Sequence, residues 1–272
     1  MESTFTPNLY DVCVLIPCYN NLAGLRKSLQ SINYRANKLY LVIVDDGSQT
    51  PVSEDELLGY LPKAYAMKVI TLDINQGITT ALNTGLQWIE AHLAVTYIAR
   101  LDCGDICHED RFYQQIYYLQ QHPKVGLLGS WCIFQSPDAE LRYEYTTPTQ
   151  HEDLIKEMHL RNAFIHPTVV FKKELVEEIG SYPTSFEHVE DYALFFRMMQ
   201  KTRTAILNQF LVTCEINPKG ISIKNRMDQL KGRYMVVQEY GRNSLWKLLG
   251  KLKLKLLMLT PYSTILKIKN AN

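Results

Sequence analysis

Residues 12–46 read VCVLIPCYNNLAGLRKSLQSINYRANKLYLVIVDD, and this stretch decides the fold. Its two apolar runs, Val12–Ile16 and Leu39–Val44, are short and rich in β-branched residues, so they predict strands covered on both faces, as in a parallel sheet. Between them, leucine and isoleucine recur at helical spacing, and Asn20 or Asn21 is placed to cap that helix. The stretch therefore predicts a strand–helix–strand unit of an α/β protein.

Polar sequence follows each of these strands, PCYN at residues 17–20 and DDGS at residues 45–48. In open α/β sheets the ligand binds beyond the carboxyl ends of the strands, where these two segments end. A carboxylate such as Asp45 can accept the ring N–H of a nucleotide base, and the neighbouring Asp46 can accept a ribose hydroxyl. Asp-Gly also forms turns without any ligand, so a structural role stays open for both acids.

The composition is that of an ordinary globular protein. The chain has 272 residues, of which 46% are hydrophobic and 21% charged, and its formal net charge is +1. This length suits one large α/β domain with an appendage, and the near-zero charge argues against a nucleic-acid partner. None of the six cysteines forms a CxxC pair, which disfavours a zinc site and favours a reducing compartment. The first residues lack the pattern of a signal peptide, so we expect a cytoplasmic protein.

The rest of the chain continues the alternation of strands and helices. Apolar runs predict further strands at 67–72, 95–101, 125–134, 169–171 and 204–215, and helical spacing predicts helices at 78–92, 109–121, 151–160, 174–179 and 188–200. A basic helical tail follows from about residue 222. We therefore expect a main domain over residues 1–215 and a basic, amphipathic helical extension over residues 216–272.

Two acids, Asp102 and Asp105, follow the strand predicted at residues 95–101. Carboxylates at a strand end suit a hard cation that also holds a diphosphate, and Mg²⁺ needs few protein ligands because it keeps several waters. A solvated loop whose acids help to start the next helix explains the same residues without a metal. The pattern predicts an Mg²⁺ or Mn²⁺ site and leaves the loop as its alternative.

Five segments taken together resemble a known family. VCVLIPCYNN, LVIVDDGS, NQGITTALNTG, IARLDCGDI and HVEDYALFFRM occur in this order over about residues 12–200. They resemble the GT-A glycosyltransferases of family two, which are inverting and use nucleotide-sugars. The resemblance implies a Rossmann-like, mostly parallel sheet flanked by helices, with the nucleotide-sugar at the strand ends. Residues 1–215 then form the catalytic domain.

The resemblance also implies roles for particular residues. It implies metal binding by Asp102 and Asp105 and a catalytic base at Asp191, beside Glu190. A positioned carboxylate can deprotonate an acceptor hydroxyl, although an acid pair at a helix start is also favoured by the helix dipole alone. The implied nucleotide-sugar site consists of Pro17, Tyr19, Asn20, Asp45, Asp46, Asn75, Gly77, Asn83, Arg100 and Asp102.

Two departures from the family pattern affect these expectations. Family members commonly read D-x-D-D where this chain reads DCGD at residues 102–105, so Gly104 replaces an acid and the metal-binding carboxylate stays undecided. Processive members carry a Q-x-x-R-W signature, which QLKGR at residues 229–233 matches only loosely. His166, before Pro167, is a further candidate to face the metal, the diphosphate or the acceptor, although a lone histidine is more often structural.

The tail, residues 244–272, carries a leucine-rich segment that is too short and too charged to span a bilayer. Lys247, Lys251 and Lys255 recur on one face of the predicted helix, leucines occupy the other face, and Lys253 interrupts them. A basic amphipathic helix can lie in a membrane interface, which would make the protein peripheral at the inner face of the membrane. The alternative is a leucine face that docks on the catalytic domain and leaves the lysines in solvent.

These patterns predict an inverting glycosyltransferase that moves a hexosyl or N-acetylhexosaminyl group from a nucleotide-sugar to a hydroxyl acceptor. UDP is the expected nucleotide, although a carboxylate accepts an N–H from uracil, thymine or guanine alike. The expected acceptor is a sugar or a lipid-linked sugar in bacterial surface polysaccharide or lipo-oligosaccharide synthesis.

Three other classes of protein are weighed against this prediction. A sugar-1-phosphate nucleotidyltransferase is disfavoured because no glycine-rich, basic phosphate loop lies near the N-terminus. A dehydrogenase is disfavoured because no G-x-G-x-x-G follows the first strand. A non-catalytic module that binds nucleotide-sugars stays open through Gly104, and the presence of Asp191 opposes it.

Overall fold

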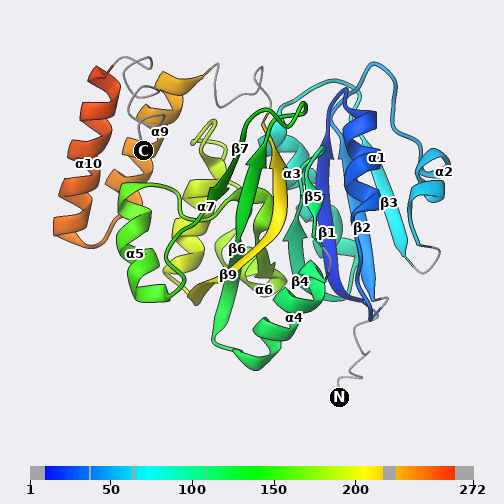
Figure 1. The fold of residues 1–272 in the computed structure, drawn as a ribbon, viewed down its shortest axis with the longest axis horizontal. Helices are drawn as coiled ribbons and strands as arrows, with labels where there is room; N and C mark the ends of the chain where they lie inside the picture. The colour runs from blue at the N-terminus through cyan, green and yellow to red at the C-terminus, as the bar shows by residue number, and fades with distance from the viewer. Residues whose placement is uncertain (1–9, 37, 63–64, 109, 217–224, 261–272) are drawn as a thin grey trace.

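The structure is a computed structural model of the chain, and it describes residues 10–36, 38–62, 65–108, 110–216 and 225–260. Its strands are β1 (Tyr10–Cys18), β2 (Leu39–Asp45), β3 (Ala66–Thr71), β4 (Val95–Arg100), β5 (Ile106–Cys107), β6 (Val125–Gln135), β7 (Arg142–Tyr145), β8 (Val170–Lys172) and β9 (Arg203–Glu215). Within the described residues these strands form one nine-stranded sheet in the order β3-β2-β1-β4-β8-β6-β9-β5, with β7 paired to β6 (Figure 1).

The parallel unit predicted from residues 12–46 is confirmed. β1 lies between β2 and β4, β3 flanks β2, and all three pairings are parallel. Alternate residues of β1 enter two hydrophobic clusters, since Val12 and Val14 belong to one and Cys13 and Leu15 to the other. Burial on both faces is the reason why the run is apolar without alternation.

Helices pack on both hydrophobic clusters and so cover the sheet from both sides (Figure 1). The cluster that contains Leu15 receives α3, α5, α6, α7, α9 and α10, and the cluster that contains Val14 receives α1, α2 and α4. The side chain of Asn21, and not that of Asn20, caps α1 by accepting from the amide of Gly24 at 3.0 Å. The helices are α1 (Leu22–Gln30), α2 (Glu54–Leu57), α3 (Ile78–His92), α4 (Arg111–Gln121), α5 (His151–Leu160), α6 (Lys173–Ile179), α7 (Glu190–Met199), α9 (Arg226–Tyr240) and α10 (Ser244–Leu259), with 3₁₀ turns η1 (Leu58–Tyr60) and η2 (His166–Thr168).

The first four strands of the sheet, β3, β2, β1 and β4, are all parallel as expected, whereas the second half of the sheet is mixed. β8 runs antiparallel to β4 and β6, β9 runs parallel to β6, and β5 and β7 pair in antiparallel fashion with β9 and β6. β8 follows η2 directly, at the edge where β4 ends, since the amide of Arg100 donates to the carbonyl of Val169 at 3.0 Å. Because β8 starts beside the end of β4, it runs back along β4 in the antiparallel direction.

The tail forms two helices, α9 and α10, that lie side by side at the opposite end of the molecule from α1 and α2 (Figure 1). Leu230, Val236 and Val237 of α9 and Leu254 of α10 are buried in the same hydrophobic cluster as α7. The extension predicted over residues 216–272 therefore packs on the preceding domain. Residues 217–224 and 261–272 of that prediction lie outside the described residues.

Candidate active site

The loops after β1 and β2 meet at the carboxyl ends of their strands, as expected. The amide of Asn20 donates to Ser48 Oγ at 2.8 Å, and the Oδ1 atom of Asn20 accepts from the amide of Gln49 at 2.8 Å. Asn20 adopts a φ of 49°, which few residues other than glycine occupy. Tyr19 is 50% exposed, so it offers an aromatic surface beside these loops, whereas Pro17 is half-buried at the end of β1.

Asp45, at the carboxyl end of β2, is fully buried. Its Oδ1 atom accepts from the amide of Ser48 at 3.1 Å, and its Oδ2 atom accepts from the amide of Val52 at 2.9 Å. Asp45 therefore orders the loop that follows β2. The ring N–H of a nucleotide base could still donate to the lone pairs of the Asp45 carboxylate that these two amides leave free.

Asp46, which is 4% exposed, holds the N-x-G turn in place. Its carboxylate accepts from Asn75 Nδ2 at 3.0 Å and from the amides of Gln76 and Gly77 at 2.8 and 2.9 Å. Gly77 has a φ of 89°, a conformation that favours glycine, and α3 begins immediately after it. The predicted residues Asp46, Asn75 and Gly77 thus form one connected unit at the strand ends.

The side-chain amide of Asn83, predicted to lie near the nucleotide, bonds to the backbone of Tyr182 in the structure. Its Nδ2 atom donates to the carbonyl of Tyr182 and its Oδ1 atom accepts from the amide of Tyr182, each at 2.9 Å. Both polar ends of the amide are used to clamp another backbone segment against α3. Asn83 therefore positions Tyr182, whose hydroxyl is 2.7 Å from His166 Nε2.

Arg100, at the end of β4, is fully buried and orients two neighbouring side chains. Its Nη2 atom donates to Asp102 Oδ1 at 2.6 Å, and its Nε atom donates to His166 Nε2 at 3.1 Å. Nη1 donates to the carbonyl of Leu15 in β1. All three nitrogens of the guanidinium therefore bond to protein groups, and Arg100 holds Asp102 and His166 in position.

His166 is neutral in this arrangement. Burial and the Arg100 guanidinium hold the pKa of His166 well below its usual range. Because Nε2 accepts from Arg100, the hydrogen-bond network places the imidazole proton on Nδ1. His166 therefore belongs both to the structural network of Arg100 and to the wall of the pocket described below.

Asp102 and Asp105 differ sharply in their surroundings. Asp102 has a side chain that is 34% exposed and lines a pocket, whereas Asp105 is 5% exposed and accepts from the amide of Glu215 at 2.8 Å. Burial and the nearby Asp102 raise the pKa of Asp105 well above its usual range. Of the two predicted metal ligands, only Asp102 faces the pocket, and Asp105 ties the loop to the end of β9.

Gly104 stands where the family pattern has an acid, and the Glu215 carboxylate occupies the adjoining space. A Cβ atom added to Gly104 would lie 3.3 Å from Glu215 Oε1, and the φ of Gly104 is 105°. Glu215 also forms an ion pair with Lys27 of α1, at 3.1 Å. The loop therefore has no room for a further side chain unless Glu215 moves.

The described part of the chain contains no group of three or more His, Cys, Asp and Glu side chains that could hold a metal ion. Asp102 alone offers a hard oxygen ligand at the end of β4 and at the pocket wall. Such a site fits an ion that is bound by one carboxylate, substrate phosphates and water, which is how Mg²⁺ commonly binds. The residues present fit a cation that arrives with a diphosphate better than a cation enclosed by protein ligands.

A pocket of about 230 Å³ gathers the candidate catalytic residues. Asp102 at the end of β4 and Asp191 at the start of α7 line the same pocket, although 89 positions separate them in the sequence. His166 and Glu190 line it too. The other lining residues are Ile78, Asn162, His188, Val189, Tyr192, Gln229 and Arg233.

Glu190, which is buried, and Asp191, which is half-buried, form an acid pair at the start of α7. Asp191 Oδ2 accepts from Asn162 Nδ2 at 2.9 Å and Oδ1 accepts from the amide of Tyr192 at 2.7 Å. Burial raises the pKa of Asp191 to about 6, while the amide of Tyr192 and the Arg233 guanidinium limit the rise. Burial and the adjacent Asp191 raise the pKa of Glu190 to about 7. A carboxylate with a pKa near neutrality is suited to accept a proton from a hydroxyl.

The lining residues to which the sequence assigned no role include Asn162, His188, Gln229 and Arg233. Asn162 gives no local signal, because its partner Asp191 is distant in sequence. His188 has a φ of 67°, and α7 consequently begins at Glu190 and not at residue 188. Gln229 and Arg233 are the loose match to the processive signature, and the structure brings both into the pocket from α9. Their spacing of four residues was the available signal.

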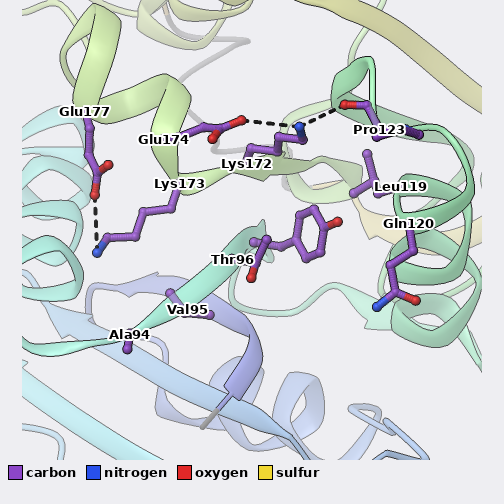
Figure 2. Close-up of a pocket in the computed structure, with 11 residues that line it drawn as sticks. Ala94, Val95, Thr96, Leu119, Gln120, Pro123, Lys172, Lys173, Glu174 and Glu177 are labelled. Atoms are coloured by element: carbon purple, nitrogen blue, oxygen red, sulfur yellow. Dashed lines mark hydrogen bonds and ion pairs between the residues drawn. The ribbon is translucent and has the colours of Figure 1, made fainter. Parts of the chain in front are cut away.

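A larger hollow of about 400 Å³ lies at the other end of β4, around Val95 and Thr96 (Figure 2). Figure 2 shows that its lysines are engaged by neighbouring groups. Lys172 contacts Glu174 and the carbonyl of Pro123, and Lys173 contacts Glu177. It contains none of the residues predicted from the sequence, so the smaller pocket is the candidate active site.

Comparisons with known proteins agree with this geometry. The family model described as glycosyl transferase family 2 matches residues 13–180. The amylovoran biosynthesis glycosyltransferase AmsE of Erwinia amylovora is 33% identical over 193 residues, which cover 68% of each chain. The UDP-Gal:alpha-D-GlcNAc-diphosphoundecaprenol beta-1,3-galactosyltransferase of Escherichia coli is 28% identical over 161 residues, covering 58% of this chain and 56% of that protein.

A solved structure supports the fold. The mannosyltransferase PcManGT of Pyrobaculum calidifontis, in complex with GDP-Man and Mn²⁺, superposes with a TM-score of 0.63 at 19% identity, covering 91% of this chain and 68% of that one. This likeness confirms the α/β fold of GT-A type, with its mixed sheet. The family match covers more than half of the chain, and the chain accordingly belongs to glycosyl transferase family 2 and is a glycosyltransferase.

Proposed function

We propose that the protein is an inverting glycosyltransferase that moves a sugar from a UDP-sugar to a hydroxyl of a sugar or lipid-linked acceptor during bacterial surface polysaccharide or lipo-oligosaccharide synthesis. The observation that carries the proposal is that Asp102 and Asp191 line one pocket of about 230 Å³. One carboxylate stands at the strand end where the nucleotide is expected. The other is a half-buried acid at the start of α7.

The proposed chemistry is a single displacement. The acceptor oxygen bonds to the anomeric carbon, the bond between that carbon and the diphosphate breaks, and the acceptor proton passes to the Asp191 carboxylate. Asn162 and the amide of Tyr192 fix this carboxylate and leave lone pairs free for the proton. Attack on the face opposite to the leaving diphosphate inverts the anomeric configuration. No covalent intermediate is required, so one carboxylate base is enough.

The leaving diphosphate needs positive charge. In this proposal Asp102, oriented by Arg100, holds the Mg²⁺ or Mn²⁺ ion, which would neutralise the developing negative charge. Arg233 lines the same pocket from α9, and its guanidinium lies near enough to Asp191 to lower the pKa of that acid. The Arg233 side chain thus supplies positive charge on the side of the pocket where Asp191 lies.

The nucleotide is proposed to lie at the ends of β1, β2 and β3. Tyr19 and Asn20 present exposed groups there, Asp45 and Asp46 order the two loops, and Asn75 and Gly77 form the adjacent turn. UDP is favoured because the galactosyltransferase relative is named for a UDP-Gal donor, although the structural neighbour was solved with GDP-Man. The names of the AmsE and galactosyltransferase relatives support a polysaccharide or lipid-linked acceptor.

A donor screen tests this function. The intact protein is incubated with UDP-hexoses, UDP-N-acetylhexosamines and GDP-mannose, each with a diphosphate-lipid-linked sugar, and nucleotide release and the anomeric configuration of the product are measured. UDP release that depends on the acceptor, with inversion at the anomeric carbon, is expected. Turnover of GDP-mannose alone would overturn the donor assignment, and a retained configuration would overturn the single displacement.

A further inference from the structure

The outer face of α10 is a stripe of exposed leucines. The six leucines are 40–82% exposed: Leu245, Leu248, Leu249, Leu252, Leu256 and Leu259. Successive members are three or four residues apart, except the adjacent pair Leu248 and Leu249, so all six lie along one side of the helix. Exposed apolar side chains gathered on one side of a helix are a feature of surfaces that bind a partner or a membrane. We call these six residues the leucine stripe.

The leucine stripe is not the face by which α10 docks on the domain. Gly250 and Leu254 are the buried residues of α10, and a Cβ atom added to Gly250 would lie 1.9 Å from the carbonyl oxygen of His159 in α5. Leu257 and Met258 are partly buried against the same core. The docking alternative from the sequence was therefore right that α10 packs on the domain, and wrong about the face. One side of the helix packs, and the leucine stripe stays outside.

Positive charge lines both borders of the stripe. Lys251 and Lys255 lie on the border that adjoins α9, where their amino groups are 5.1 and 5.8 Å from the ring centre of Tyr234. Lys253 is two positions from each of them, which places it near the opposite border. No acidic residue occurs in α10 itself. An apolar stripe between lysines matches the chemistry of a bilayer interface, with acyl chains below and anionic head groups at the sides.

We propose that α10 seats the protein on an anionic bilayer, with the leucine stripe in the acyl boundary and the lysines at the head groups. A second copy of the chain is a poorer match, because pairing two stripes would bring the lysine borders of both copies together with no acid from either helix between them. The helix lies on the surface and does not cross the bilayer, since no helix in the described ranges is long and apolar enough to do so.

This surface is connected to the active site through α9. α10 packs against α9, which supplies Gln229 and Arg233 to the pocket that contains Asp191. A bilayer under α10 would therefore lie next to the helix that lines the acceptor side of the site. The inference goes beyond the proposed function and does not depend on it, because membrane binding is measured without donor, acceptor or turnover.

Co-sedimentation of the intact chain with vesicles tests the inference. One set of vesicles is phosphatidylcholine alone, and the other is phosphatidylcholine mixed with phosphatidylglycerol. The wild-type protein should bind the anionic set, and the double variant Leu252→Ser/Leu256→Ser should lower the partition coefficient by about tenfold or more, because two leucines lose their apolar contact. The matched control Leu58→Ser/Leu141→Ser removes leucines that are 58% and 52% exposed elsewhere, and it should bind like the wild type.

Two further measurements keep the outcomes distinct. Lys251→Gln/Lys253→Gln should weaken binding to anionic vesicles, and added salt should do the same, because exposed charges are screened over about 8–10 Å at physiological ionic strength. Circular dichroism confirms that each variant is folded. Wild-type protein that ignores both kinds of vesicle would overturn the inference, as would a stripe variant that binds as well as the control. A concentration-dependent dimer that Leu252→Ser/Leu256→Ser dissociates, without vesicle binding, would assign the stripe to a second copy instead.

Discussion

Replacing Glu190 with glutamine should stabilise the protein at alkaline pH and have little effect in acid. Glu190 is 6% exposed, and its Oε2 atom has no hydrogen-bond partner in the described structure. Burial and the adjacent Asp191 raise the pKa of Glu190 from 4.5 to about 7. A carboxyl with a raised pKa in the folded state makes its full contribution to stability below its unfolded pKa, and this contribution is lost as the pH rises through the folded pKa. Glutamine has the same shape and does not titrate.

The size of the effect follows from that pKa difference. A rise from 4.5 to about 7, at ~1.4 kcal/mol for each pH unit, corresponds to a loss on the order of 3 kcal/mol in the wild type once the pH is well above 7. Urea unfolding at about pH 5 and about pH 8.5 measures the free energy of unfolding of both proteins. Glu190→Gln should gain roughly 2–3 kcal/mol more on the wild type at the higher pH than at the lower.

Glu187→Gln is the matched control, because the Glu187 side chain is 83% exposed and only three positions away. Its effect on the unfolding free energy should differ between the two pH values by about 1 kcal/mol or less, because its interactions with His188 and Glu190 act through solvent. An equal gain from Glu190→Gln at both pH values, or no gain at the higher one, would refute the reasoning that a buried charge at Glu190 destabilises the fold.

Three further predictions concern the active site. Asp191→Asn should lower transfer by about 10²–10⁴-fold and leave nucleotide binding intact, because asparagine cannot take up the acceptor proton. Since the pKa of Asp191 is raised to about 6, kcat/KM of the wild type should fall as the pH drops below about 6. Arg233→Gln should move this fall to higher pH, because it removes a positive charge that lowers the pKa of Asp191. Near wild-type transfer by Asp191→Asn would remove the base assignment. Chelation should abolish transfer, and Asp102→Asn should increase the Mn²⁺ concentration needed. Asp105→Ala should mainly lower the urea midpoint, because the amide of Glu215 loses its acceptor. Full activity in chelator would contradict the metal role. Asp45→Ala should lower both the urea midpoint and the nucleotide affinity measured by calorimetry, because the buried amide of Val52 loses its acceptor at about 1–3 kcal/mol and the partly buried amide of Ser48 loses its acceptor too. Unchanged stability would show that the loop does not depend on these bonds.

The local elements could be predicted because their signals are local. The helices at 78–92 and 151–160 begin and end at the predicted residues, since apolar spacing marks the face that each turns to the core. The mixed half of the sheet could not be predicted in this way. β8 has three residues, and its place between β4 and β6 depends on strands that are distant in the sequence.

The same distinction explains the active site. The acids at strand ends were recognisable as a group, because parallel strands end at one edge of a sheet. Their individual roles depend on partners far along the chain. Asp105 meets the amide of Glu215, 110 positions away, and Asn83 meets the backbone of Tyr182, 99 positions away. No pattern in the segments around Asp105 or Asn83 indicates these partners. The expectation that both residues face the ligand therefore came from the family resemblance alone.

The shared space of Gly104 and Glu215 restricts the order in which mutations can accumulate in this loop. Gly104→Asp alone would place a side chain 3.3 Å from an existing carboxylate, on a backbone with a φ of 105° that residues with a Cβ atom rarely adopt. Two like charges in contact would add their repulsion to that strain. The Glu215 carboxylate would have to swing away from the new acid, which would weaken its ion pair with Lys27. A mutation that shortens Glu215 should therefore make Gly104→Asp easier to accommodate, although a single residue separates DCGD from the D-x-D-D pattern.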